Sequence, residues 1–133
     1  MASLRESLKG LCAVVALAAG AAALAVGLGK LELESRLNQP FRAQIPLIGL
    51  KKGEMEDLRA GLASEADFAR HSVERSDAAL GLLFELVSTG PETGYIQVRS
   101  RRHVREPALE FIVELDTPGG RRLRTYSVLL ETN

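Results

Sequence analysis

Apolar and polar residues alternate along most of this chain, and this two-residue period constrains its fold more than any other feature. The clearest stretch places Leu109, Phe111, Val113 and Leu115 at one set of alternate positions and Glu110, Glu114 and Asp116 at the other. Successive side chains of a β-strand point to opposite faces, so this pattern predicts a strand with one buried and one solvated face. Similar stripes occur at 31–34, 41–47, 82–86, 96–99 and 126–130.

Turn-forming residues separate these stripes. The segments 90–94 and 117–120 are rich in Gly and Pro and predict hairpin loops between neighbouring strands. Pro46 lies inside the stripe at 41–47 and lacks a backbone N–H donor, which predicts that this strand is bulged or lies at a sheet edge. The segment 40–47 is therefore a candidate edge on which a partner could add a strand. The alternative is that Pro46, Arg42 and the following Lys51 and Lys52 simply protect this edge.

The period changes between Gly53 and Ala79. Met55, Leu58 and Leu62 are spaced as one face of a helix, and Ser64 with Asp67 resembles a capping box that opens a second short helix. We therefore expect a mainly β fold, an antiparallel β-sandwich of immunoglobulin-like or Greek-key type, with one or two short helices inserted at about residues 53–70. A small β-barrel is the alternative.

The first 25 residues have the three parts of a secretory signal peptide. Arg5 and Lys9 precede an uncharged run from Leu11 to Leu28, and residues 23–25 (Ala-Leu-Ala) form a small-x-small cleavage site. We expect a signal-peptide helix over residues 1–25, cleavage after Ala25 and a mature exported domain over residues 26–133.

The alternative for the leader is a retained anchor. Residues 11–28 would span about 27 Å as a helix, close to the thickness of a bilayer's hydrocarbon core, and would tether the domain to a membrane. Eight of these eighteen residues are Ala, which weakens the case for stable insertion. Both interpretations predict an exported domain.

Composition excludes several classes of function. The 17 Lys and Arg residues balance 17 Asp and Glu residues, and aromatic residues make up 5% of the chain, which argues against a nucleic-acid binder. Cys12, the single cysteine, lies in the leader, so the mature domain has no thiol for a disulfide, a nucleophile or a metal. His71 and His103 are not at ligand spacing. We predict no catalytic, cofactor-binding or metal-binding residues, and no enzyme.

The candidate interaction residues are basic and form two groups. The first arginine cluster comprises Arg99, Arg101, Arg102, His103 and Arg105, and the second arginine cluster comprises Arg121, Arg122 and Arg124. Sequence does not say whether the clusters meet in space. Together they could dock an acidic protein, anionic lipid headgroups or peptidoglycan carboxylates. The alternative is ordinary solubilising charge, paired with Glu106, Glu110 and Glu114.

Four blocks resemble, in order, the N-terminal periplasmic domain of FimV/HubP-type proteins. They are residues 28–45, 62–70, 98–107 and 119–130. The resemblance implies a bacterial envelope protein whose long members are linked to type IV pilus assembly, twitching motility and polar organisation. Those members continue into a LysM motif, a transmembrane segment and cytoplasmic repeats, whereas this sequence ends at Asn133. We expect a free-standing short form without LysM or C-terminal repeats.

The expected function is a non-enzymatic, exported protein-interaction module of the cell envelope that assists type IV pilus or polar-complex assembly. The family offers no catalytic residues to transfer. The alternative function is a peptidoglycan- or anionic-headgroup-binding module that uses the arginine clusters. The expected partner is an envelope or pilus-assembly protein, with the inner membrane involved only if the leader is retained and with no nucleic acid.

Overall fold

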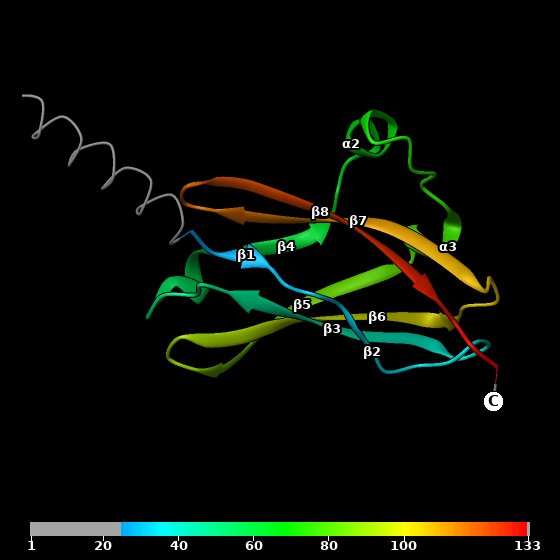
Figure 1. The fold of residues 1–133 in the computed structure, drawn as a ribbon, viewed down its shortest axis with the longest axis horizontal. Coiled ribbons are helices and arrows are strands. Elements are labelled where there is room, and N and C mark those ends of the chain that lie inside the picture. Colours follow the sequence, from blue (N-terminus) through cyan, green and yellow to red (C-terminus); the bar gives the residue numbers. More distant parts are fainter. Residues whose placement is uncertain (1–24, 133) are drawn as a thin grey trace, which may run out of the picture.

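The computed structural model describes residues 25–132, which form two antiparallel β-sheets packed face to face (Figure 1). The first sheet has the order β1-β3-β6-β5, with β2 also paired to β3. Its strands are β1 (Gly27–Leu28), β2 (Glu32–Leu33), β3 (Pro40–Ile48), β5 (Leu82–Gly90) and β6 (Thr93–His103). The second sheet has the order β4-β7-β8, with β4 (Arg59–Leu62), β7 (Ala108–Thr117) and β8 (Gly120–Leu129). The expected antiparallel sandwich is confirmed, and the described strands do not close into a barrel.

Most of the expected signal peptide, residues 1–24, lies outside the described residues. Among residues 25–132, no helix is both long enough and apolar enough to cross a membrane. The predicted anchor over residues 11–28 falls almost entirely in the part of the chain that the structure does not describe.

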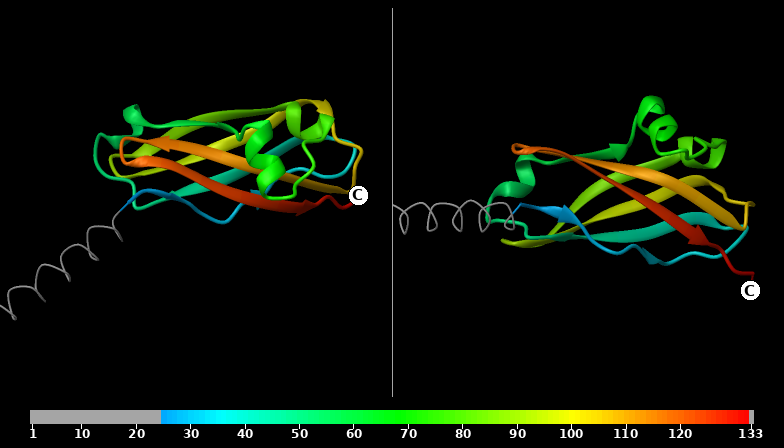
Figure 2. Two further views of the ribbon diagram at one scale, coloured as in Figure 1. Left: turned by 90° about the horizontal axis from the view of Figure 1, so that it is seen from above. Right: turned by 45° about the horizontal axis from the view of Figure 1, so that its top comes forward.

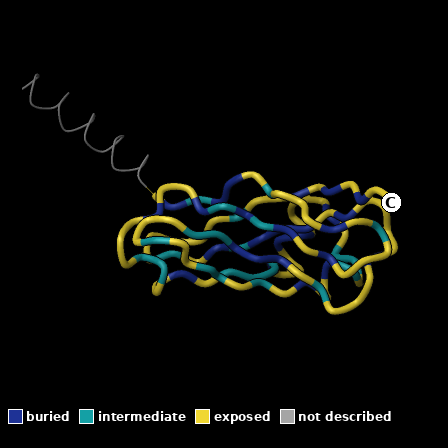
Figure 3. Tube along the Cα trace, turned by 90° about the horizontal axis from the view of Figure 1, so that it is seen from below, coloured by how far each residue is buried: buried dark blue, intermediate teal, exposed yellow. Residues whose placement is uncertain are grey.

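The core lies between the two sheets and comes largely from the predicted stripes at 41–47, 96–99, 109–115 and 126–130 (Figure 3). The stripe at 31–34 does not supply a buried face, because Leu33 is 38% exposed and Leu31 is only half-buried. Phe41 of β3 meets Phe111 of β7 edge to face, with ring centroids 6.0 Å apart and an interplanar angle of 85°. Tyr126 of β8 continues this aromatic contact, its ring 5.9 Å from that of Phe111. Aromatic pairs in this geometry add to the stabilisation that burial alone provides. The two sheets are therefore joined at their centre by side chains from three strands.

A buried hydroxyl ties the start of the domain to its last strand. The Tyr126 hydroxyl donates a hydrogen bond to the Gly29 carbonyl oxygen at 2.7 Å, and Arg124 Nη1 donates to the Leu28 carbonyl oxygen at 2.9 Å. Burial raises the pKa of Tyr126 to about 12, so the hydroxyl remains a donor at neutral pH. Because of these two bonds, the segment after β1 lies against β8.

The expected helix through Met55, Leu58 and Leu62 is wrong in its second half. Residues Glu54–Asp57 form a single 3-10 turn, η1, and Leu58 is already extended, with φ −96° and ψ 148°. Residues 59–62 are β4, which pairs with β7. Pairing with β7, the central strand of the second sheet, provides hydrogen bonds to the backbone groups of residues 59–62. A helix this short would leave most of the N–H and C=O groups at its two ends without partners.

The expected edge strand at 40–47 is also wrong. β3 is an interior strand, paired with β6 on one side and with both β1 and β2 on the other. Pro46 lies at the position where β1 has ended and β2 has not yet begun, and its carbonyl accepts a hydrogen bond from Gly29 N at 2.8 Å. The missing N–H of Pro46 thus coincides with an interruption in the neighbouring strands.

Two short helices cover part of the outer face of the second sheet (Figure 2). They are α2 (Glu65–Arg70) and α3 (Asp77–Leu80). The predicted cap is confirmed, because the Asp67 N–H donates to Ser64 Oγ at 3.2 Å, and Ser76 caps α3 in the same way. Phe68 of α2 and Ile112 on the outer face of β7 are almost completely buried.

Candidate functional site

The first arginine cluster borders a groove at one end of the sandwich. Pairing between β5 and β6 ends at Leu82 and Ser100, whereas β6 continues to His103. Beyond this point a groove of about 450 Å³ opens between α3, the start of β5 and the end of β6. We call it the α3–β6 groove, and its lining includes Leu80, Leu83, Arg101, Arg102 and His103.

A bulge in β6 carries the two central arginines into this groove. Arg99 pairs with Arg42 and His103 pairs with Pro40, so β6 uses more residues than β3 between the same two pairs. Ser100 stabilises the bulge, because its Oγ accepts from Phe41 N at 2.8 Å and donates to the Arg102 carbonyl oxygen at 2.7 Å. Bulges re-aim side chains in this manner at the ends of strands.

The groove combines unpaired positive charge with exposed apolar surface. Among residues 25–132, no ion pair involves an arginine of the first cluster, and Arg101 and Arg102 are exposed. Leu80 is 53% exposed and Leu83 is 37% exposed, values that are high for leucine. Asp77 and Glu106 line the same groove, so its charge is mixed.

The second arginine cluster lies at the opposite end of the sandwich, beside the β7–β8 hairpin (Figure 1). β7, about 30 Å long, separates it from the first cluster. Two of its three members have structural partners: Arg121 pairs with Asp67 and Glu114, and Arg124 holds the Leu28 carbonyl. Arg122 is exposed. The two clusters therefore do not form one patch.

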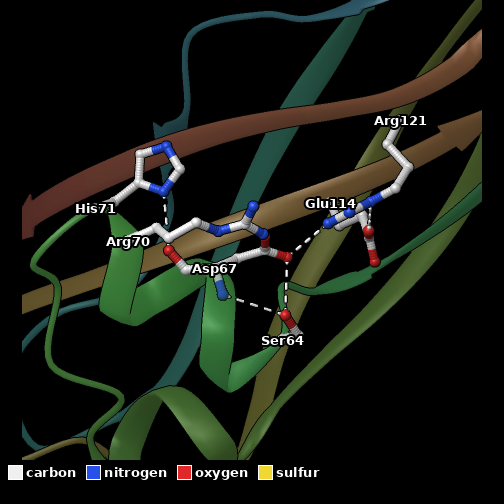
Figure 4. A network of polar contacts seen from close by, with 6 residues as sticks. All are labelled: Ser64, Asp67, Arg70, His71, Glu114 and Arg121. Atoms are coloured by element: carbon white, nitrogen blue, oxygen red, sulfur yellow. Dashed lines mark hydrogen bonds and ion pairs between the residues drawn. The ribbon is translucent and has the colours of Figure 1, made fainter.

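Sequence reasoning missed the part that Asp67 plays beyond its helix cap. Its side chain is 1% exposed, yet it accepts hydrogen bonds from Ser64 Oγ at 2.9 Å, from Arg121 Nη2 at 2.5 Å and from Arg70 (Figure 4). The bond from Ser64 lowers the pKa of Asp67 most, and contacts with Arg121 and Arg70 lower it further, against the raising effect of burial. The carboxylate fastens α2 to the β7–β8 hairpin.

Arg121 is fixed from two sides. Its hydrogen bond with Glu114 raises the pKa of its guanidinium most, and its hydrogen bond with Asp67 raises that pKa further.

The two histidines lie apart in the structure. His71 Nδ1 lies 2.8 Å from the Asp67 carbonyl oxygen, at the end of α2, and His103 borders the α3–β6 groove. Within the described part of the chain, no three His, Cys, Asp or Glu side chains gather as a metal site would require.

Comparison with known proteins agrees with this fold. Residues 26–133 match the family model for the FimV N-terminal domain, described as an Ig-like domain. The chain belongs to the FimV N-terminal domain family. The resemblance in the sequence blocks is thereby confirmed. This FimV-type domain is 35% identical over 131 residues to the motility hub protein FimV of Pseudomonas aeruginosa PAO1, and equally to that of strain UCBPP-PA14.

The two matches cover 98% of this chain but only 14% of each relative, so the chain spans a small part of the curated relatives' length. No solved structure matches the chain.

Proposed function

We propose that this FimV-type domain is a non-enzymatic, exported module that binds another protein of the bacterial envelope through the α3–β6 groove and thereby assists type IV pilus or polar-complex assembly. Two findings support the proposal. The relatives are described as motility hub proteins, and the family is that of the FimV N-terminal domain. The groove gives such a module a defined place of contact.

The observation that carries the proposal is the pairing of exposed leucines with free guanidinium groups in one groove. Burying Leu80 and Leu83 against a partner would contribute roughly 25 cal/mol per Å² of apolar surface. Arg101 and Arg102 can each donate charge-assisted hydrogen bonds to a carboxylate. The partner that fits is a protein segment with an apolar side chain next to acidic residues.

The mixed charge of the groove favours a protein segment over a purely anionic surface. Asp77 and Glu106 in the lining would repel the repeated negative charges of lipid headgroups or peptidoglycan. To bind such a surface, the domain would need the second arginine cluster to extend the positive charge beyond the groove. Arg121 of that cluster is already paired within the domain. Binding to peptidoglycan or headgroups is therefore the competing outcome of the test below.

Site-specific photo-crosslinking in the bacterium that encodes the chain tests the proposal. A photoreactive amino acid replaces Leu80, and in a matched chain it replaces Ile48, which is 59% exposed but outside the groove. We expect a discrete protein adduct from position 80 and none from position 48. The pair of substitutions Arg101→Ser and Arg102→Ser should reduce this adduct at least tenfold, whereas Arg122→Ser should leave it unchanged.

Sedimentation of the purified domain with isolated sacculi provides the second arm. If the domain sediments with sacculi in low salt, is released as ionic strength rises, and gives no protein adduct at position 80, the peptidoglycan function replaces the one proposed here. The assignment of the groove would also be contradicted if Arg122→Ser abolished the adduct while the double variant Arg101→Ser, Arg102→Ser retained it.

A further inference from the structure

The outer edge of β8 is long, regular and unpaired. β3, β6 and β7 each have a hydrogen-bonded neighbour on both sides, and the edges of β4 and β5 contact each other across the sandwich. β1 contacts β8, where the side chains of Arg124 and Tyr126, not the β8 backbone, bond to the Leu28 and Gly29 carbonyl oxygens. β8 pairs with β7 alone, in unbroken register over its whole length. An edge of this kind is a template for another strand, which proteins ordinarily block with proline, charge or a bulge.

The ladder shows which backbone groups face outward. Thr117 pairs with Gly120 at the hairpin, and Leu130 N donates to the Pro107 carbonyl oxygen at 2.7 Å. Hydrogen-bonded positions alternate in an antiparallel ladder, so the even-numbered residues of β8 bond to β7. Thr125, Ser127 and Leu129 turn their N–H and C=O groups the other way, and within residues 25–132 these groups have no backbone partner.

Half of this edge is protected and half is open. Arg122 and Arg124 occupy alternate positions on the core-facing side of β8, and inward-facing charge is one device that discourages strand addition. Residues 125–129 (Thr-Tyr-Ser-Val-Leu) contain neither charge nor proline, and Leu129 is 76% exposed. A groove of about 390 Å³, lined by Leu31, Leu33 and residues 124–129, runs along this open half.

We propose that β8 of a second copy of this chain occupies the open half of the edge. The two strands run antiparallel about a two-fold axis at Ser127, so that Thr125 of one copy pairs with Leu129 of the other. The second sheets of both copies then form one continuous sheet. This register uses the outward-facing donors and acceptors of the uncharged segment and leaves the arginine-bearing half outside the ladder.

The charges beside the edge favour a second copy over a foreign strand. Arg122, Arg124 and Lys30 lie toward the start of β8, whereas Glu131 lies beyond its end. Glu34 and Arg36 lie beside Glu131, and Glu34 is ion-paired with Arg42. Antiparallel self-pairing about Ser127 brings Glu131 of one copy beside Arg122 and Arg124 of the other, and the two-fold axis repeats this contact. A foreign strand would have to supply both charge patterns itself.

This interface is independent of the α3–β6 groove. The groove is built on β5 and β6, and β5 lies at the side of the sandwich away from β8. A dimer through β8 therefore leaves the groove accessible on each copy. The proposed dimer and the proposed binding function can each fail without the other.

Disulfide trapping tests both the edge and the register. All variants carry Cys12→Ser, so that the introduced cysteine is the only one. Chains with Thr125→Cys are mixed with chains with Leu129→Cys under mild oxidation. Opposed residues of a hydrogen-bonded pair have Cα atoms about 5.5 Å apart, which a disulfide can span. We expect a mixed disulfide dimer, little dimer from either chain alone, dimer from Ser127→Cys, and none from the exposed control Ser88→Cys.

Sedimentation of the untagged wild-type chain supplies the second measurement. We expect a concentration-dependent dimer whose dissociation constant rises at least tenfold in Ser127→Pro, because that variant loses an outward-facing backbone donor and no backbone bond to β7. Ser127→Ala loses the hydroxyl bond to Glu110 but keeps the N–H, and should still dimerise. A wild-type chain that stays monomeric overturns the proposal. So does a dimer that forms without the mixed disulfide between positions 125 and 129.

Discussion

Replacing Phe111 with Ala should lower the free energy of unfolding by about 3–5 kcal/mol. Phe111 is fully buried at the centre of β7, where its ring contacts Phe41 of the opposite sheet and Tyr126 of the adjacent strand. Truncation removes both aromatic contacts and leaves a cavity that rigid strands on either side cannot fill. Urea denaturation followed by far-UV circular dichroism measures the change.

Ile48→Ala is the control for the core substitution. Ile48 lies at the end of β3 and is 59% exposed, so its truncation should change stability by no more than about 0.5 kcal/mol. If Phe111→Ala costs less than about 1 kcal/mol, or no more than Ile48→Ala, the aromatic cluster does not hold the two sheets together.

Replacing Asp67 with Asn should destabilise the domain at neutral pH and much less in acid. The substitution removes the negative charge that Arg70 and Arg121 share and weakens the attachment of α2 to the β7–β8 hairpin. Because the pKa of Asp67 is lowered in the folded state, ionised Asp67 contributes stability at every pH above its unfolded pKa of about 4. That contribution is lost as the pH falls through the lower pKa of the folded state.

Parallel denaturation of wild type and Asp67→Asn from pH 7 to pH 2 measures this dependence. The difference in unfolding free energy should be constant above about pH 5 and should shrink as the pH falls below about 4. Asp57→Asn, at an exposed position in η1, is the matched control and should differ little from wild type at any pH. A difference for Asp67→Asn that persists undiminished at pH 2 would show that its charge is not what holds α2.

Sequence alternation was sufficient to predict the long strands β3, β5, β6, β7 and β8, and hence the sandwich, because a half-buried strand alternates between its two faces in two-residue steps. It was insufficient for β4, where Leu58 and Leu62 have helical spacing but pairing with β7 determines the local structure. The sequence did contain one indication that helices cover the second sheet. Ile112 is an apolar residue on the same face of β7 as Glu110 and Glu114, and it is buried on this outer face beneath the helices.

The candidate site was only partly accessible to sequence reasoning. The first arginine cluster was found as a run of charges, but the bulge that directs Arg101 and Arg102 depends on Ser100 replacing a backbone acceptor for Phe41. Nothing in the order of residues distinguishes Arg121, which pairs with the buried Asp67 on α2, from an arginine free to bind a partner. Such assignments depend on contacts between segments more than fifty residues apart.

The central claim, that this FimV-type domain works outside the cytoplasm, is tested most directly by the mass of the chain recovered from the periplasmic fraction of the bacterium that encodes it. Cleavage after Ala25 predicts a mature protein that begins with Val26. An uncleaved chain that begins with Met1 and is found in the cytoplasmic fraction would contradict the claim.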